Sequence, residues 1–124
     1  MSVVPENLKY TKDHEWAKLE GAVATVGVTD HAQRELGDIV FVELPKVGAR
    51  YEAGQSFGTI EAVKTVAELY SPVTGTITEV NEALSADAGV INQDPYGTGW
   101  IIKVKLDKAS GDELMDAAAY KALI

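Results

Sequence analysis

The sequence predicts a mainly β protein, a compact barrel or sandwich of short strands with a short helix and a C-terminal helix. Segments rich in Val, Ile and Thr recur along the chain, and Gly, Pro and Asp separate them at short spacing. In "WIIKVKL" at 100–106, apolar residues alternate with two lysines, as in a strand that buries one face. Short strands at such spacing are typical of barrels and sandwiches.

The composition fits a single domain over residues 1–124. The chain is 46% hydrophobic and 24% charged, which is ordinary for a folded domain of this length. A net charge of -8 disfavours binding to nucleic acid or to anionic membranes. The absence of cysteine excludes disulfides, thiolate metal sites and a cysteine nucleophile. No segment has the pattern of a signal peptide or a membrane span, so we expect a cytoplasmic bacterial protein, or a mitochondrial one only if a transit peptide has been removed.

Four segments have the composition of strands. The first is rich in Val and Thr, the second is a nearly continuous apolar run that Pro45 ends, and the last two alternate. Turn residues separate them from their neighbours. In chain order, these strands are predicted at 21–28, 38–44, 73–80 and 100–106.

A short helix is predicted between the first two of these strands. Thr29 or Asp30 can cap its first turn and Gly37 follows its last residue, so about two turns are expected. The segment 81–97 is less regular, and a short helical turn followed by a loop is predicted there.

The end of the chain predicts a second helix over about 111–123. Ser110 and Glu113 form a capping box at its start. We expect the helix to pack on the β body through an apolar stripe of Leu114, Ala117, Ala118 and Leu123.

Most signatures of a self-sufficient enzyme are missing. There is no G-x-S-x-G nucleophile motif and no phosphate-binding G-x-x-x-x-G-K-[ST] loop. The "GTG" at 97–99 precedes a strand instead of following one, which argues against a dinucleotide site. His31 and Glu35 are spaced i, i+4 and could share a metal ion, but a solvated helix face is the favoured interpretation.

The segment "DHEW" at 13–16 is another candidate. Glu15 can act as a base or bind an amine, and Trp16 begins the β region. The alternative is a surface turn anchored by a core tryptophan. Neither interpretation supplies a complete active site, so any chemistry has to come from a covalently attached group.

Lys64 is the residue to which such a group can be attached. It lies between the strand-like segments "TIEAV" and "TVAELY", which predicts a hairpin over about 54–75 with Lys64 near its tip. Glu61 and Glu68 are close in sequence, and Gly75 ends the turn after the second strand. The alternative is an ordinary exposed lysine that protects a sheet edge. A rigid tip keeps the amine accessible to acylation, which removes its charge, and the attached group then carries the reactive atoms.

Successive blocks of the chain are "KYTKDHEWAKLEG", "VGVTDHAQRELGDIVFVELPKVG", "FGTIEAVKTVAELYSPVTG", "VNEALSADAGVINQDPYGTGWIIKVKL" and the final helix. In this order they resemble the H-protein family of the glycine cleavage system, with Ala62 and Thr65 as mild departures from its pattern. The resemblance implies a barrel-sandwich hybrid of the lipoyl/biotinyl carrier type. It also implies lipoic acid in amide linkage on Lys64, with Glu61 and Gly75 in the attachment region.

The resemblance further implies a monomeric carrier that catalyses nothing by itself. Its lipoyllysine would receive an aminomethyl group from glycine through glycine decarboxylase (P protein). The aminomethyltransferase (T protein) and dihydrolipoamide dehydrogenase (L protein) would then act in turn, and a lipoate ligase or lipoyltransferase would attach the group. In the family the loaded arm folds into a cleft. There we expect Glu15, and less directly Asp13 and Glu68, to meet its cationic amine.

Other interpretations of the lysine remain open at this point. Biotin carriers share the scaffold but place Met on both sides of the lysine, where this chain has Val63 and Thr65. Lipoyl domains of 2-oxoacid dehydrogenases have Asp before the lysine and belong to longer chains with flexible linkers. A lipoate relay protein would pass lipoyl groups to other enzymes. A Schiff-base enzyme would need Lys64 as a buried amine of lowered pKa.

Overall fold

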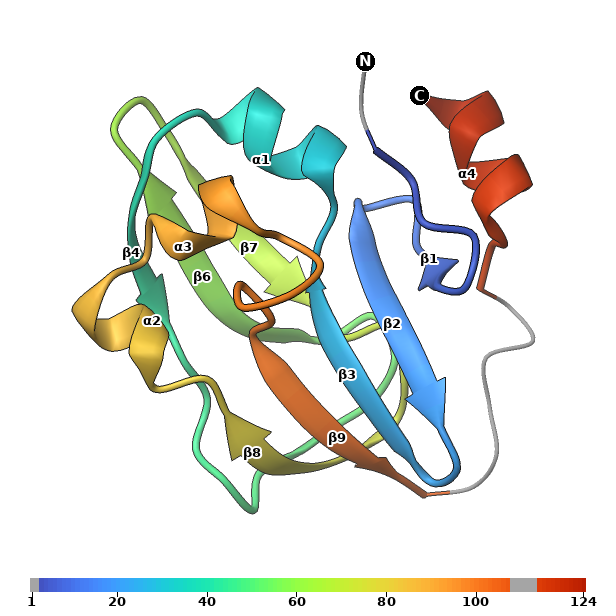
Figure 1. The fold of residues 1–124 in the computed structure, drawn as a ribbon. Coiled ribbons are helices and arrows are strands. Elements are labelled where there is room, and N and C mark those ends of the chain that lie inside the picture. Colours follow the sequence, from blue (N-terminus) through green and yellow to red (C-terminus); the bar gives the residue numbers. More distant parts are fainter. Residues whose placement is uncertain (1–2, 108–113) are drawn as a thin grey trace.

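The computed structural model describes residues 3–107 and 114–124. Within these ranges the chain forms two antiparallel sheets and four short helices (Figure 1), which confirms the predicted mainly β fold. The larger sheet has the strand order β1-β2-β3-β9-β8-β5, and the smaller has the order β4-β6-β7. The strands are β1 (Lys9–Tyr10), β2 (Glu15–Glu20), β3 (Val23–Val28), β4 (Ile39–Glu43), β5 (Arg50–Tyr51), β6 (Ser56–Ala62), β7 (Val66–Tyr70), β8 (Gly75–Val80) and β9 (Ile102–Leu106). The helices are α1 (Asp30–Leu36), α2 (Ala83–Ala86), α3 (Val90–Gln93) and α4 (Ala117–Leu123).

The main core lies between the inner faces of the two sheets. Val26 and Val104 from the larger sheet belong to the same buried cluster as Val42, Ile60 and Leu69 from the smaller one. The four strands predicted at 21–28, 38–44, 73–80 and 100–106 are confirmed as β3, β4, β8 and β9, each slightly shorter than predicted. Two sheets enclosing one core, with short helices at the side, form the expected barrel-sandwich hybrid.

Helix α1 is confirmed with both of its predicted ends. The hydroxyl of Thr29 accepts a hydrogen bond from the backbone N–H of Ala32 at 3.1 Å, so Thr29 is the N-cap. Gly37 ends the helix with a φ of 79°, a conformation that glycine adopts without steric cost. The segment 81–97 holds two short helices, α2 and α3, where one turn and a loop were predicted.

The predicted start of the C-terminal helix was wrong. The helix begins at Ala117, and its N-cap is Asp116, whose carboxylate accepts the N–H of Ala119 at 2.9 Å. Met115 instead pairs with Tyr10 as an isolated β-bridge, because both backbone hydrogen bonds to Tyr10 hold it extended. The capping box of Ser110 and Glu113 falls outside the described residues.

The predicted apolar stripe of this helix was wrong in part, since Ala117 is buried as predicted. Ala118 and Leu123 are exposed, and the buried face consists of Ala117 and Tyr120. The Tyr120 ring stacks on the Tyr10 ring with centroids 4.7 Å apart. Helix α4 therefore packs through an aromatic pair in a second cluster, separate from the main core.

Candidate functional site: the Lys64 turn and its groove

Lys64 occupies the turn between β6 and β7, as predicted, and its side chain is exposed. The turn consists of Val63, Lys64 and Thr65 and is closed by a hydrogen bond from the N–H of Ala62 to the carbonyl of Thr65 at 2.8 Å. A Schiff-base nucleophile needs a buried amine, so this exposure argues against that alternative. The same exposure leaves the amine accessible to an acylating enzyme.

A contact from another segment holds the turn in place. The N–H of Val63 donates to the carbonyl of Asp38 at 2.9 Å, in the connection between α1 and β4. The stem of Lys64 runs beside Gly37, where a Cβ would lie 3.4 Å from Cε of the lysine. The tip of the hairpin therefore rests on the end of α1 and does not project freely.

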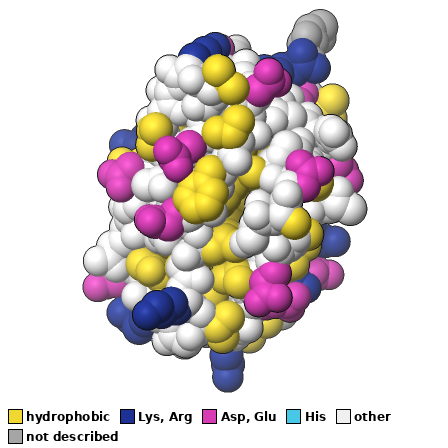
Figure 2. Space-filling view, turned by 90° about the vertical axis from the view of Figure 1, so that its left-hand side faces the viewer, with side chains coloured by type: hydrophobic (Ala, Val, Ile, Leu, Met, Phe, Trp, Pro, Cys, Tyr) yellow, Lys and Arg dark blue, Asp and Glu magenta, His cyan; other side chains and the backbone are white. Residues whose placement is uncertain are grey.

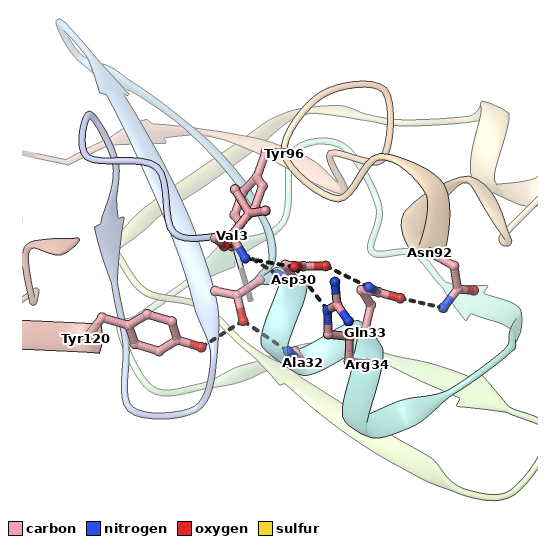
Figure 3. A network of polar contacts seen from close by, with 9 residues as sticks. Val3, Asp30, Ala32, Gln33, Arg34, Asn92, Tyr96 and Tyr120 are labelled. Carbon is pink, nitrogen blue, oxygen red and sulfur yellow. Dashed lines mark hydrogen bonds and ion pairs between the residues drawn. The ribbon is translucent and has the colours of Figure 1, made fainter. Parts of the chain in front are cut away.

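Asn92, on α3, fixes the segment on which the tip rests. Its amide nitrogen donates to the carbonyl of Gly37 at 2.8 Å, and its amide oxygen accepts the N–H of Ile39 at 2.9 Å. These contacts lie on either side of Asp38 in the chain. Figure 3 shows that Asn92 also donates to the side chain of Gln33 on α1, at 3.0 Å. A single amide thus holds the connection that receives Val63.

The start of α1 is held by a second group of contacts, drawn in Figure 3. The carboxylate of Asp30 accepts hydrogen bonds from the backbone of Val3 and from the side chains of Gln33 and Arg34. Burial alone would raise the pKa of Asp30, but these donors lower it below its usual value. The N–H of Asp30 donates to the hydroxyl of Tyr96 at 2.9 Å. Both ends of α1 are therefore fixed by contacts from distant segments.

A groove of about 150 Å³ runs between α1, the start of β2 and the β6–β7 hairpin. Its apolar wall includes Leu36, Ile60 and Ala67, and Leu36 immediately precedes the glycine beside the Lys64 stem. The lining residues are Asp13, His14, Glu15, Val28, Ala32, Glu35, Leu36, Ile60, Ala67, Glu68 and Leu69. All three carboxylates predicted for the cleft, Glu15, Asp13 and Glu68, thus lie on one groove.

Glu15 is the buried carboxylate of the three, with 2% of its surface exposed. Its oxygens accept hydrogen bonds from the hydroxyl of Thr11 at 2.9 Å and from the N–H of Tyr70 at 3.0 Å. Burial raises the pKa of Glu15 to about 7, although both hydrogen bonds act in the opposite direction. Near neutral pH the group is therefore present both as a neutral acid and as an anion that can attract a cation.

The other predicted residues have different surroundings. Asp13 is exposed at the rim of the groove. The carboxylate of Glu68 is also exposed and accepts a hydrogen bond from the hydroxyl of Ser56 at 3.0 Å. Glu61 lies on β6 opposite Val66. Only Glu15 of the predicted carboxylates is fixed inside the fold.

Gly75 is not brought to the tip. It begins β8 in the larger sheet, opposite Tyr51 and Leu106, and in Figure 1 this strand lies at the far end of the molecule from the β6–β7 turn. A Cβ at Gly75 would collide with the carbonyl of Lys105. The close approach of two strands accounts for this glycine.

The surface-turn interpretation of "DHEW" holds for part of the segment. Trp16 is buried and its indole N–H donates to the carbonyl of Pro95 at 3.0 Å, so the tryptophan is an anchor. Glu15, however, is inside the protein. His14 adopts a positive φ of 68°, which is unusual for a residue other than glycine. The turn thus points its carboxylate inward.

His14 belongs to a polar chain that sequence spacing did not reveal. Its Nδ1 lies 2.8 Å from the hydroxyl of Tyr120, which lies 2.7 Å from the hydroxyl of Thr29. Burial and the neighbouring His31 lower the pKa of His14, which favours the neutral form of its ring. Among residues 3–107 and 114–124, no group of three or more His, Cys, Asp or Glu side chains could hold a metal ion.

Known proteins are similar to this chain along almost its whole length. A family model described as "Glycine cleavage H-protein" matches residues 8–124. The glycine cleavage system H protein of Chlorobium limicola is 60% identical over 98% of this chain and 97% of its own length. The glycine cleavage system H protein of Bacteroides thetaiotaomicron is 54% identical over 97% of this chain and 96% of its own length.

A solved structure gives the same result. The crystal structure of a glycine cleavage system H protein from Mycobacterium marinum superposes with a TM-score of 0.88, at 42% identity, and covers 96% of this chain and 97% of that one. In the part of this chain that the structure describes, no helix has the length and apolar character needed to cross a membrane. With an exposed lysine at a fixed hairpin tip and matches along almost its whole length, the chain belongs to the glycine cleavage H-protein family.

Proposed function

We propose that the chain is a lipoyl-carrying shuttle of the glycine cleavage system, with lipoic acid in amide linkage on Lys64. The observation that carries this proposal is the exposed amine on a turn that Asp38 and Asn92 hold in place. The residues present suit such a group, because an apolar-walled groove lies along α1, whose C-terminal end is next to the lysine stem, and is lined by a buried carboxylate. When bound, the group would supply a dithiolane whose S–S bond can open, so that one of its sulfurs can carry an aminomethyl fragment between enzymes.

The protein's own residues then have three tasks. The β6–β7 turn presents the attachment point, and the groove wall of Leu36, Ile60 and Ala67 excludes water from an arm that lies against it. Glu15, as an anion, attracts the positive charge of an amine in the groove. Replacing Glu15 with Ala should therefore shorten the lifetime of the loaded protein, measured as ammonia release. An unchanged rate would remove Glu15 from this role.

The partners follow from the same assignment. They are glycine decarboxylase, the aminomethyltransferase, dihydrolipoamide dehydrogenase and a lipoate ligase or lipoyltransferase, which this protein would visit as a monomer in the bacterial cytoplasm. In this role the protein is a substrate of these enzymes and not a catalyst. The relatives named above, from Chlorobium limicola and Bacteroides thetaiotaomicron, are bacterial.

The test is the intact mass of protein from a lipoate-replete host, followed by peptide mapping across residues 51–103. We expect a single lipoyl adduct on Lys64 and none on the Lys64→Arg variant. An adduct on another lysine would overturn the site, and the absence of any adduct after incubation with a lipoate ligase would overturn the carrier assignment.

A lipoate relay protein is the second candidate, because the same exposed lysine would serve it. The discriminating measurement is the exchange of labelled bicarbonate into glycine with glycine decarboxylase. A shuttle supports the exchange, whereas a pure relay protein does not.

A further inference from the structure

The small sheet has an outward surface that the core does not use. The strand register places Phe41 of β4, Glu61 of β6 and Val66 of β7 in one row across this sheet. Residues paired across strands share a face, and the neighbouring row of Val42, Ile60 and Ala67 faces the core. We call the outward surface the outer face. It consists of Val40, Phe41, Glu43, Thr59, Glu61, Val63, Val66 and Glu68.

The end of the outer face near Lys64 is apolar and exposed. The exposed fractions of its side chains are 75% for Val63, 60% for Val66, 58% for Val40 and 48% for Phe41. Figure 2 shows the side of the molecule on which β4 and the β6–β7 turn lie, with a band of hydrophobic side chains between acidic ones. Large apolar side chains gathered next to a modified residue mark an interaction site.

The outer face also carries carboxylates: Glu61 lies between Phe41 and Val66, and Glu43 and Glu68 lie in the next outward row. Glu43, Glu61 and Glu68 come from the three strands in turn, and β4, β6 and β7 contain no Lys or Arg. By contrast, four strands of the larger sheet carry basic residues, namely Lys9 on β1, Lys18 on β2, Arg50 on β5, and Lys103 and Lys105 on β9. A partner that covers the outer face is therefore complementary if its own surface is apolar and places basic groups opposite these carboxylates.

We propose that the outer face is the docking surface for the enzyme that forms the amide bond on Lys64, and that this enzyme presents such an apolar surface with basic groups on it. The proposal rests on the carrier function proposed above. An enzyme that acts on the free lysine has to reach an amine at the end of a short side chain. It therefore has to contact Val63 and Val66, which lie on either side of Lys64. An enzyme that acts on the far end of an attached arm does not have this constraint.

The covalent step fits this approach. The amine of Lys64, after losing its proton, attacks the carbonyl carbon of an activated lipoyl group. The new C–N bond forms as the bond to the adenylate or carrier thiol breaks, and the second amine proton leaves to a base or to water. The outer face takes no part in this chemistry, so it acts only by bringing the two proteins together.

The experiment measures kcat/KM for lipoylation of the apo protein by a purified lipoate ligase with ATP and lipoate. Phe41→Lys and Val66→Lys should each lower it at least about tenfold, because each places a buried charge in the apolar centre of the complex. The matched control is Val47→Lys, since Val47 is 60% exposed and borders the larger sheet instead. It should stay within about twofold of the wild type.

Charge reversal tests the acidic part. Glu43→Lys and Glu61→Lys should lower kcat/KM about fivefold each at low salt, and added NaCl should reduce the difference from the wild type. Glu20→Lys, at the exposed end of β2, is the control and should change little. Circular dichroism and urea midpoints establish that each variant is folded. If Phe41→Lys is not folded, the lipoylation rate of Val66→Lys alone tests the apolar part of the outer face.

Three results would overturn the proposal. One is equal rates for outer-face variants and controls. Another is self-association of the wild type that Val66→Lys abolishes while lipoylation is unchanged, which would assign the outer face to a second copy. The third is that outer-face variants are lipoylated at the wild-type rate but react more slowly with the enzymes that act after lipoylation. If the wild type itself is not lipoylated, the carrier function fails, a result distinct from all three.

Discussion

The β2–β3 and β6–β7 hairpins reverse the chain by different means. In the first, Glu20 pairs with Val23, and Gly21 in the turn has a φ of 62° with no other atoms near its Cβ position. In the second, the turn around Lys64 contains no glycine, and its own Ala62–Thr65 hydrogen bond is supplemented by one from the N–H of Val63 to the carbonyl of Asp38. The first turn is stable through its own residues. The second is shaped by contacts from elsewhere, which leaves its residues free to be chosen for function.

Glu15 connects the two hairpins. It begins β2 opposite Val28, and its carboxylate accepts the N–H of Tyr70 at the end of β7. The groove lies beside this connection. The geometry of the groove therefore depends on how the two hairpins are held against each other, and the following variants separate their contributions.

Asn92→Ala should have the largest effect, because it removes the support of the β6–β7 turn. Three hydrogen bonds are lost, two of them to backbone groups of the Gly37–Ile39 segment. We expect the free energy of unfolding to fall by about 3 kcal/mol. The rate of lipoylation at Lys64 should also fall about fivefold, since the turn is no longer held in one position. Urea unfolding and a lipoylation assay measure the two effects.

Asn81→Ala is the matched control for this variant. Asn81 also makes three hydrogen bonds with its amide, to the carbonyls of Thr98 and Trp100 and from the N–H of Ala83. Its loss should destabilise the protein by a similar amount of about 3 kcal/mol without slowing lipoylation under conditions where the protein is folded. Equal slowing in both variants would show that stability, and not the position of the turn, controls the rate.

The second-largest effect is expected at Glu15, which connects the two hairpins and makes the stability of the protein depend on pH. The Glu15 carboxyl loses its proton near pH 4.5 in the unfolded chain, but its pKa in the folded protein is about 7. Between these values the folded state holds the extra proton, so stability falls as pH rises, by up to about 3 kcal/mol from this group. Glu15→Gln should make the urea midpoint less dependent on pH between 5 and 8.

Glu20→Gln is the control for the pH experiment, because Glu20 is an exposed carboxylate at the other end of β2 and is not among the groups that shift the pKa of Glu15. It should leave the pH dependence as in the wild type. If Glu15→Gln and the wild type lost stability equally on raising the pH, burial of Glu15 would not be the cause.

The smallest effect is expected at the β2–β3 turn, which is stable through its own residues. Gly21→Ala forces a residue with a Cβ into a positive φ, which should cost about 1 kcal/mol of stability. Lipoylation should be unchanged, because no contact of this turn reaches the Lys64 segment. A slower reaction would show that the hairpins are coupled along their strands, and the contrast between them would no longer hold.

Features whose determinants are close in sequence could be predicted. The strands follow from alternation and β-branched runs, and α1 follows from Thr29 and Gly37 at its two ends. Lys64 at a hairpin tip followed from the strand-like segments on either side of it. In each case the energetic reason lies within a few residues, so the local pattern is sufficient.

Features that depend on distant partners could not be predicted. The C-terminal helix starts late because Met115 pairs with Tyr10, a partner far away in the chain. The burial of Glu15 requires Tyr70 from another sheet, although its sequence position did mark it as a candidate. No local sequence pattern marks Asn92 as important. An amide that holds three groups on two other segments has no spacing from which it could be recognised.

The support of the Lys64 turn by Asn92 determines what the minimal unit of recognition is. A peptide covering 54–75 contains the lysine and both strands, but it lacks the Asp38 carbonyl and the amide that fixes it. Transplanting that loop into a foreign scaffold would therefore carry over the proposed attachment residue without its orientation. A portable acceptor tag derived from this protein would have to include three separate stretches of chain, namely the loop, the α1–β4 connection and α3.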